Sequence, residues 1–125
     1  MKKSFVIVFV SLMISFAAIA QNSAEAANKN TALRCLKLAE NCLVGNDWQN
    51  ALNQAELGLS YDDSISDLYY IKAASSLNLG GTKADALRLL ASAFERASWA
   101  GYTKNGARLF LADLLSDTGD RKSVV

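Results

Sequence analysis

The sequence predicts an all-α protein in which antiparallel helix-turn-helix units stack as a short solenoid. Three observations indicate this: helical periodicity runs almost unbroken after residue 30, no proline interrupts it, and residues of matched size recur at a 35-residue offset. Periods in the twenties to forties are typical of repeats that bury their apolar faces against one another. The matched pairs are Ala39 and Ala74, Ala51 and Ala86, Gly58 and Ala93, Leu52 and Leu87, and Leu59 and Phe94.

The first 20 residues are typical of a secretory signal peptide. Lys2 and Lys3 precede an apolar run over residues 5–20, and Ala18 and Ala20 form an A-x-A cleavage site. A second such site ends at Ala26, so cleavage as late as this residue is the alternative. The run is shorter than the ~20 residues of a spanning helix, which favours cleavage over an uncleaved anchor or a buried helix. We therefore expect export, to the periplasm or outside the cell.

Composition argues against catalysis, metal binding and nucleic-acid binding. The chain has 13 basic and 12 acidic side chains with no basic cluster, and it contains no histidine. Gly80-Gly81 lacks the spacing of a phosphate-binding loop. Cys35 and Cys42 lie seven residues apart on one predicted helix, ~10 Å and thus beyond disulfide reach. We expect no cofactor and two small buried thiols, an intermolecular disulfide being the alternative.

After a flexible leader over residues 21–30, the pattern predicts five helices within residues 31–119. The first covers residues 31–44, and Gly45 ends it in a left-handed conformation. Asp47 caps the second helix. The third covers residues 65–79, with Ser64 and Asp67 as a capping box, and Gly80-Gly81 stops it.

The last two helices follow the same logic. Thr82 and Asp85 form a capping box for the fourth helix, over residues 83–97. An irregular connection over residues 98–102 leads to Thr103, which we expect to cap the fifth helix, and Gly119 ends that helix.

The order of small and bulky residues resembles tetratricopeptide repeats. The first unit carries Leu38-Ala39, Trp48, Ala51 and Gly58 at motif positions. The second carries Tyr70, Ala73-Ala74, Ala86, Leu90 and Ala93, and a third begins with Ala112 and Gly119. Cys35, Asp63 and Ser98 depart from the motif. The resemblance implies a right-handed solenoid of about two and a half repeats, and a plain five-helix bundle is the alternative.

The resemblance also implies a concave face that binds a peptide or an amphipathic helix of a protein partner. It places on that face Leu36, Lys37, Glu40, Ile71, Ser75, Asn78, Asp113 and Asp117. The acidic members favour a ligand with some basic character, although many apolar residues of this face also suit a core. Trp48 is expected to be structural, and Trp99 and Tyr102 either cover the core or contact a partner.

The C-terminal end favours a longer natural protein. The fifth helix is apolar over most of residues 107–115, a composition that favours packing against another helix or against a second copy of the chain. The tail over residues 120–125 matches what a common sequencing adapter encodes in one frame, and a frayed terminus is the alternative. The expected function is a non-catalytic interaction module of the cell envelope, or else the accessory repeat region of a longer envelope enzyme, transport or assembly component.

Overall fold

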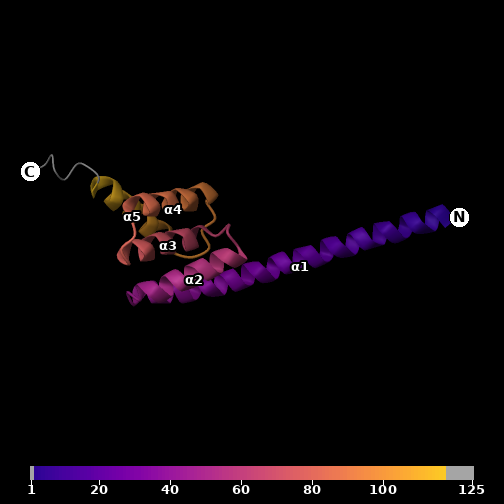
Figure 1. Cartoon of the computed structure of the whole chain (residues 1–125), viewed down its shortest axis with the longest axis horizontal. Helices are drawn as coiled ribbons and strands as arrows, with labels where there is room; N and C mark the ends of the chain where they lie inside the picture. Colours follow the sequence, from indigo (N-terminus) through magenta and orange to yellow (C-terminus); the bar gives the residue numbers. More distant parts are fainter. Residues whose placement is uncertain (1, 118–125) are drawn as a thin grey trace, which may run out of the picture.

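A computed structural model of the protein describes the backbone of residues 2–117 and the side chains of residues 23–116. The five helices are α1 (Lys2–Val44), α2 (Trp48–Tyr61), α3 (Ser66–Asn78), α4 (Lys83–Arg96) and α5 (Lys104–Asp117) (Figure 1). No strand occurs in this part of the chain, which confirms the all-α prediction. The side chains of Ala18 and Ala20, and the whole tail over residues 120–125, lie outside the described residues.

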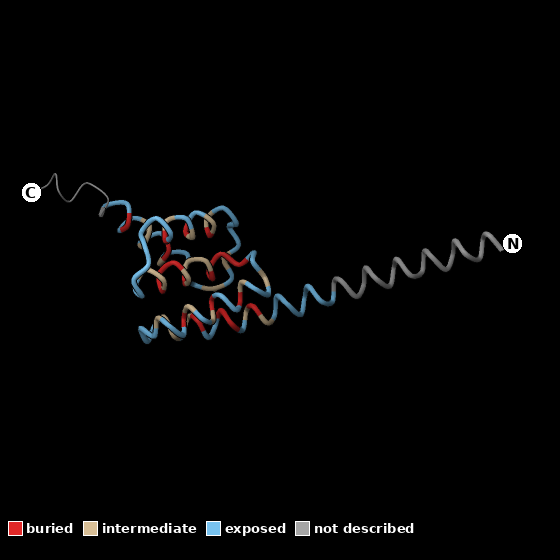
Figure 2. Tube along the Cα trace, viewed as in Figure 1, coloured by how far each residue is buried: buried red, intermediate tan, exposed pale blue. Residues whose placement is uncertain are grey.

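The first helix begins well before the predicted boundary. Residues 21–30, expected to be a flexible leader, are helical and continuous with the rest of α1. Residues 23–30 are exposed, so their helical state depends on local preference rather than on packing (Figure 2). Ala24, Ala26 and Ala27 have the highest helix propensity, and neither glycine nor proline interrupts α1.

The helices form two hairpins that pack against each other. In Figure 1, α2 runs back along α1 and α4 runs back along α3; α2 and α1 also contact α3, and α5 contacts α3 and α4. Buried residues lie on the facing sides of the helices (Figure 2). One core cluster lies among α1, α2 and α3 and contains Ala32, Leu36, Ala39, Ala51, Ala55, Ile65, Leu68 and Ile71. The other joins α3, α4 and α5 through Ala73, Ala86, Leu90, Ala107 and Leu114.

The small residues of the 35-residue offset lie where helices approach closely. Ala39, Ala51, Ala86 and Ala93 are all buried. Gly58 is the tightest point: a methyl group there would lie 2.9 Å from Leu68 Cδ1 and 3.2 Å from Cys35 Cβ. The predicted role of these positions in helix contact is therefore confirmed.

Two of the predicted helix starts are confirmed. The Asp47 carboxylate accepts a hydrogen bond from the backbone N–H of Asn50 at 3.4 Å, and Thr82 Oγ1 accepts one from Asp85 at 3.2 Å. These bonds satisfy backbone donors that a helix leaves free in its first turn.

Two other predicted end signals were assigned to the wrong residue. The left-handed residue after α1 is Asn46, with φ of 58°, and not Gly45, since asparagine also tolerates this conformation. Ser64 and Asp67 do not form a capping box, because α3 starts from Ile65 without a side-chain cap. Thr103 precedes α5 as predicted: its carbonyl accepts the N–H of Ala107 at 2.8 Å, and its side chain donates to Asp67.

Candidate functional site

The loop over residues 97–103, which connects α4 to α5, is attached to the start of α3. The N–H of Ser66 donates to the Ser98 carbonyl at 2.9 Å, and the N–H of Ser98 donates to Ser66 Oγ at 2.9 Å. The chain enters this loop through Ala97, which has φ of 50°. The paired bonds fix the first half of the loop to the start of α3.

Asp67 fixes the second half of the same loop. Its side chain has no exposed surface and accepts hydrogen bonds from the N–H groups of Ala100 (2.6 Å) and Gly101 (3.1 Å) and from Thr103 Oγ1 (2.7 Å). A buried carboxylate is tolerated only when such donors replace its hydration. The three bonds therefore give this irregular segment a defined shape.

A groove of about 270 Å³ lies between the fixed loop and α1. One wall belongs to α1 and the other to the loop. The lining residues are Leu33, Leu36, Lys37, Glu40, Ala100, Gly101 and Tyr102. The groove thus combines an apolar floor with two opposite charges and one aromatic ring.

Glu40 is the unusual group of this groove. Its Oε1 atom is buried and has no hydrogen-bond partner, and a methyl group on Gly101 would overlap that atom. Burial raises the pKa of the Glu40 carboxyl above its ordinary value, the negative charge of Asp67 raises it further, and Lys37 opposes the rise. Only a glycine at position 101 leaves space for the carboxylate here.

The two aromatic residues of the loop have different surroundings. Trp99 packs against Phe94, with ring centroids 5.4 Å apart, and covers the second core cluster. Tyr102 is 97% exposed and lines the groove. Of the two roles left open for this pair, Trp99 therefore covers the core and Tyr102 is free to contact a partner.

The structure brings together only part of the predicted concave set. Leu36, Lys37 and Glu40 line one wall of the groove. Ile71 and Ser75 have no exposed surface, so they belong to the interior rather than to a contact face, and Ser75 Oγ has no partner there.

The remaining predicted residues lie elsewhere. Asn78 donates to the Ala74 carbonyl at 2.8 Å, within its own helix. Asp113 is exposed on α5, and the side chain of Asp117 lies outside the described residues.

Sequence reasoning missed the loop wall of the groove. Asp67 was interpreted as a local helix cap, whereas its partners lie 33 to 36 residues further along the chain. The sequence feature that could have indicated this wall is the pair of small residues Ala100-Gly101, which lies in a connection longer than a simple turn.

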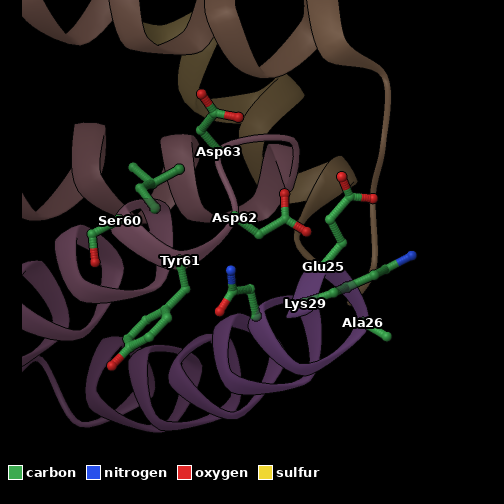
Figure 3. A pocket seen from close by; sticks show the side chains of 9 residues that line it. Glu25, Ala26, Lys29, Ser60, Tyr61, Asp62 and Asp63 are labelled. Carbon is green, nitrogen blue, oxygen red and sulfur yellow. The ribbon is translucent and has the colours of Figure 1, made fainter. Parts of the chain in front are cut away.

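A second, larger groove of about 620 Å³ lies between the exposed middle part of α1 and the end of α2 (Figure 3). Its lining residues are Glu25, Ala26, Asn28, Lys29, Leu59, Ser60, Tyr61, Asp62 and Asp63. Asp62 accepts hydrogen bonds from the N–H and Oγ of Ser64, which lower the pKa of its carboxyl. Cleavage after Ala26 would remove part of this groove.

No cluster of three or more His, Cys, Asp or Glu side chains in the described part of the chain has a metal-binding arrangement. Cys35 is buried and Cys42 is half-buried, and both are free thiols. Among the residues searched, no helix combines the length and the apolar character needed to cross a bilayer.

Comparison with known proteins gives a partial similarity. No protein-family model matches the chain, and no solved structure matches it. The chain is 39% identical over 72 residues to an uncharacterized protein of Treponema pallidum (strain Nichols), a match that covers 57% of this chain. The matched segment spans only 9% of the length of that relative.

Proposed function

We propose that the protein is a non-catalytic interaction module whose groove between α1 and the 97–103 loop binds a peptide or a helix of a partner protein. The hairpins would form a right-handed solenoid of the tetratricopeptide kind, and the module would act in the cell envelope after removal of its signal peptide. The observation that carries the proposal is the groove itself, built by an irregular loop that Asp67 holds in place.

Two features support binding in this groove. Leu33 and Leu36 offer an apolar floor, while the loop wall is fixed before any ligand arrives, which lowers the entropic cost of association. Lys37 and Tyr102 are exposed at its edges and provide polar and aromatic contacts. Short peptides bound to helical surfaces are recognised by this combination of apolar anchors and a few polar groups.

A substitution that fills the groove tests the proposal. A random peptide library is selected on the immobilised full chain, and the enriched peptides are then measured against two variants. Ala100→Trp fills the groove from an exposed position, and Ala91→Trp adds the same ring at an exposed position of α4 outside it. We expect Ala100→Trp to lose binding and Ala91→Trp to retain it. Equal binding by both variants, or no enrichment at all, contradicts the proposal.

A second candidate is the accessory repeat region of a longer envelope enzyme or of a transport or assembly component. It is favoured by the relative of Treponema pallidum, in which the matched segment is a small part of a much longer chain. Resequencing the locus through the codons of residues 120–125 tests this candidate. A frame that continues into further coding sequence supports it, and a natural stop after codons unrelated to an adapter contradicts it.

Envelope location has its own test. The full chain is expressed in a Gram-negative bacterial host, and the periplasmic fraction is analysed by intact-mass spectrometry. We expect a product that begins after Ala20 or after Ala26. A full-length product confined to the cytoplasm contradicts export.

A further inference from the structure

We propose that the groove between α1 and the 97–103 loop receives a single lysine or arginine side chain of the bound peptide. The cation would face the Glu40 carboxylate, its aliphatic stem would lie along Leu33 and Leu36, and the Tyr102 ring would close over it. This inference rests on the proposed peptide-binding function and specifies which residue of the peptide the groove selects.

The first argument is the distribution of charge and hydrogen bonds. Asp67 is satisfied by three donors from the loop, whereas Glu40 has one buried oxygen without any donor. Lys37 lines the same groove, yet no ion pair joins it to Glu40 in the described structure. Because Gly101 covers Oε1, an incoming cation would donate to the other oxygen of the Glu40 carboxylate and stabilise the charge that both oxygens share.

The second argument is the aromatic wall. Tyr102 is almost fully exposed, so the faces of its ring are accessible to a ligand in the groove. Cations are attracted to the face of an aromatic ring. The chain already uses this contact elsewhere, because the Arg96 guanidinium lies 4.6 Å from the centre of the Tyr69 ring.

The third argument is size. The groove volume of about 270 Å³ is below the ~300–1,000 Å³ that holds a small-molecule ligand. It is instead suited to one long side chain. Leu33, which is half-buried, and the small exposed part of Leu36 provide the apolar surface that the methylene groups of lysine or arginine cover while the charged end remains hydrated or paired.

Binding of a cation should then depend on pH through Glu40. Protonation of the carboxylate removes the attraction, so affinity should fall as the pH falls through the raised pKa of Glu40. The charged groups that act on Glu40 are Asp67 of α3 and Lys37 of α1. No histidine is present anywhere in the chain to produce a competing transition near neutral pH.

The test uses three probes that differ at one end of the same side chain. The full-length, ¹⁵N-labelled protein is titrated to millimolar concentration with the N-acetyl, N-methylamide derivatives of lysine, arginine and norleucine, and amide shifts are followed by NMR. Norleucine keeps the aliphatic stem of lysine without its charge. We expect lysine and arginine to shift the amides of Glu40, Gly101 and Tyr102, with norleucine at least fivefold weaker.

Variants assign the effect to the proposed contacts. Glu40→Gln should weaken the lysine probe about tenfold, as expected for a lost hydrogen bond to a charged group. Tyr102→Ala should weaken it less. Glu56→Gln, at an exposed position of α2 outside the groove, removes the same charge and should leave affinity unchanged.

The outcomes separate this inference from the function on which it rests. Equal shifts from norleucine and lysine, or unchanged affinity in Glu40→Gln, overturn the cation site while the library peptides still bind the groove. No shift at these three amides with any probe also overturns it. If the library peptides do not bind and the probes also cause no shifts, both proposals are overturned.

Discussion

Thr103 Oγ1 donates a hydrogen bond to Asp67 Oδ2 over 2.7 Å, and this contact links the entrance of α5 to the first turn of α3. The same carboxylate accepts the N–H groups of Ala100 and Gly101. One buried side chain therefore links the entrance of α5 to the groove wall.

Replacing Asp67 with alanine should destabilise the fold strongly. Three donors would lose their acceptor in a partly buried site, and leaving such groups unsatisfied costs about 2–4 kcal/mol in total. Removal of the repulsion between Asp67 and Glu40 would offset part of this cost. Urea denaturation followed by circular dichroism measures this change. Asp113→Ala on the exposed face of α5 is the control and should stay within about 0.5 kcal/mol. Equal effects of the two variants would show that the loop bonds contribute little.

A large residue at Gly58 should disrupt the contact of α2 with both neighbouring helices. The glycine faces Leu68 and Cys35 at distances that already exclude a methyl group without movement. Gly58→Leu should therefore lower the free energy of unfolding by about 3 kcal/mol or more through overpacking. Thermal denaturation tests this against Glu56→Leu, which adds the same side chain at an exposed position of α2. An unchanged melting temperature in Gly58→Leu would contradict the close approach.

Arg96 and Arg88 on α4 should differ in their contribution to stability. Arg96 donates to the Asp63 carbonyl at 2.7 Å and lies over Tyr69, so it ties α4 to the turn before α3. Its replacement with alanine should cost about 1 kcal/mol. Arg88 pairs with Asp85 on the surface, and its replacement should cost no more than about 0.5 kcal/mol. The two free energies of unfolding from matched urea titrations decide the point, and a larger loss at Arg88 would reverse the assignment.

Glu40 should make the fold less stable as the pH rises. Because its pKa is raised in the folded state, the native protein binds the proton more tightly than the unfolded chain does. The stabilisation is complete below the ordinary glutamate pKa and is lost as the pH rises through the folded value. Glu40→Gln should therefore gain stability relative to the natural chain at about pH 7.5 compared with about pH 4. Urea denaturation measures the free energy of unfolding of both proteins across this pH range. If the difference between the two proteins does not change with pH, Glu40 does not have the predicted effect.

Local patterns were sufficient to predict the helices and the close contacts between them. Ala51, Ala86 and Gly58 mark helix contacts because only small residues permit such an approach, and Asp47 and Thr82 mark helix starts through bonds that span three residues. These signals arise from neighbours in the chain, which a pattern can capture. The start of α1 was less predictable, since Ala-rich polar segments suit a helix and a leader equally well.

Only one wall of the candidate groove could be predicted, because sequence patterns capture contacts between neighbours in the chain. Helical spacing places Leu36, Lys37 and Glu40 on one side of α1, and the structure confirms that they line one surface. The opposite wall depends on Asp67 reaching a loop more than 30 residues away, and no local pattern distinguishes that carboxylate from a helix cap. The burial of Ile71 and Ser75 also follows from tertiary packing, because α1, α2 and α4 all contact α3.

The paired bonds between Ser66 and Ser98 join the two free ends of the α3–α4 hairpin, opposite its turn at Gly80-Gly81. This hairpin is therefore closed at both ends, covalently at the turn and by hydrogen bonds at the other end. A proteolytic nick in the exposed glycine turn would leave α3 and α4 held together without a continuous backbone. The turn is thus the natural position at which to open the chain for a split reporter or an inserted domain, with the groove on the far side undisturbed.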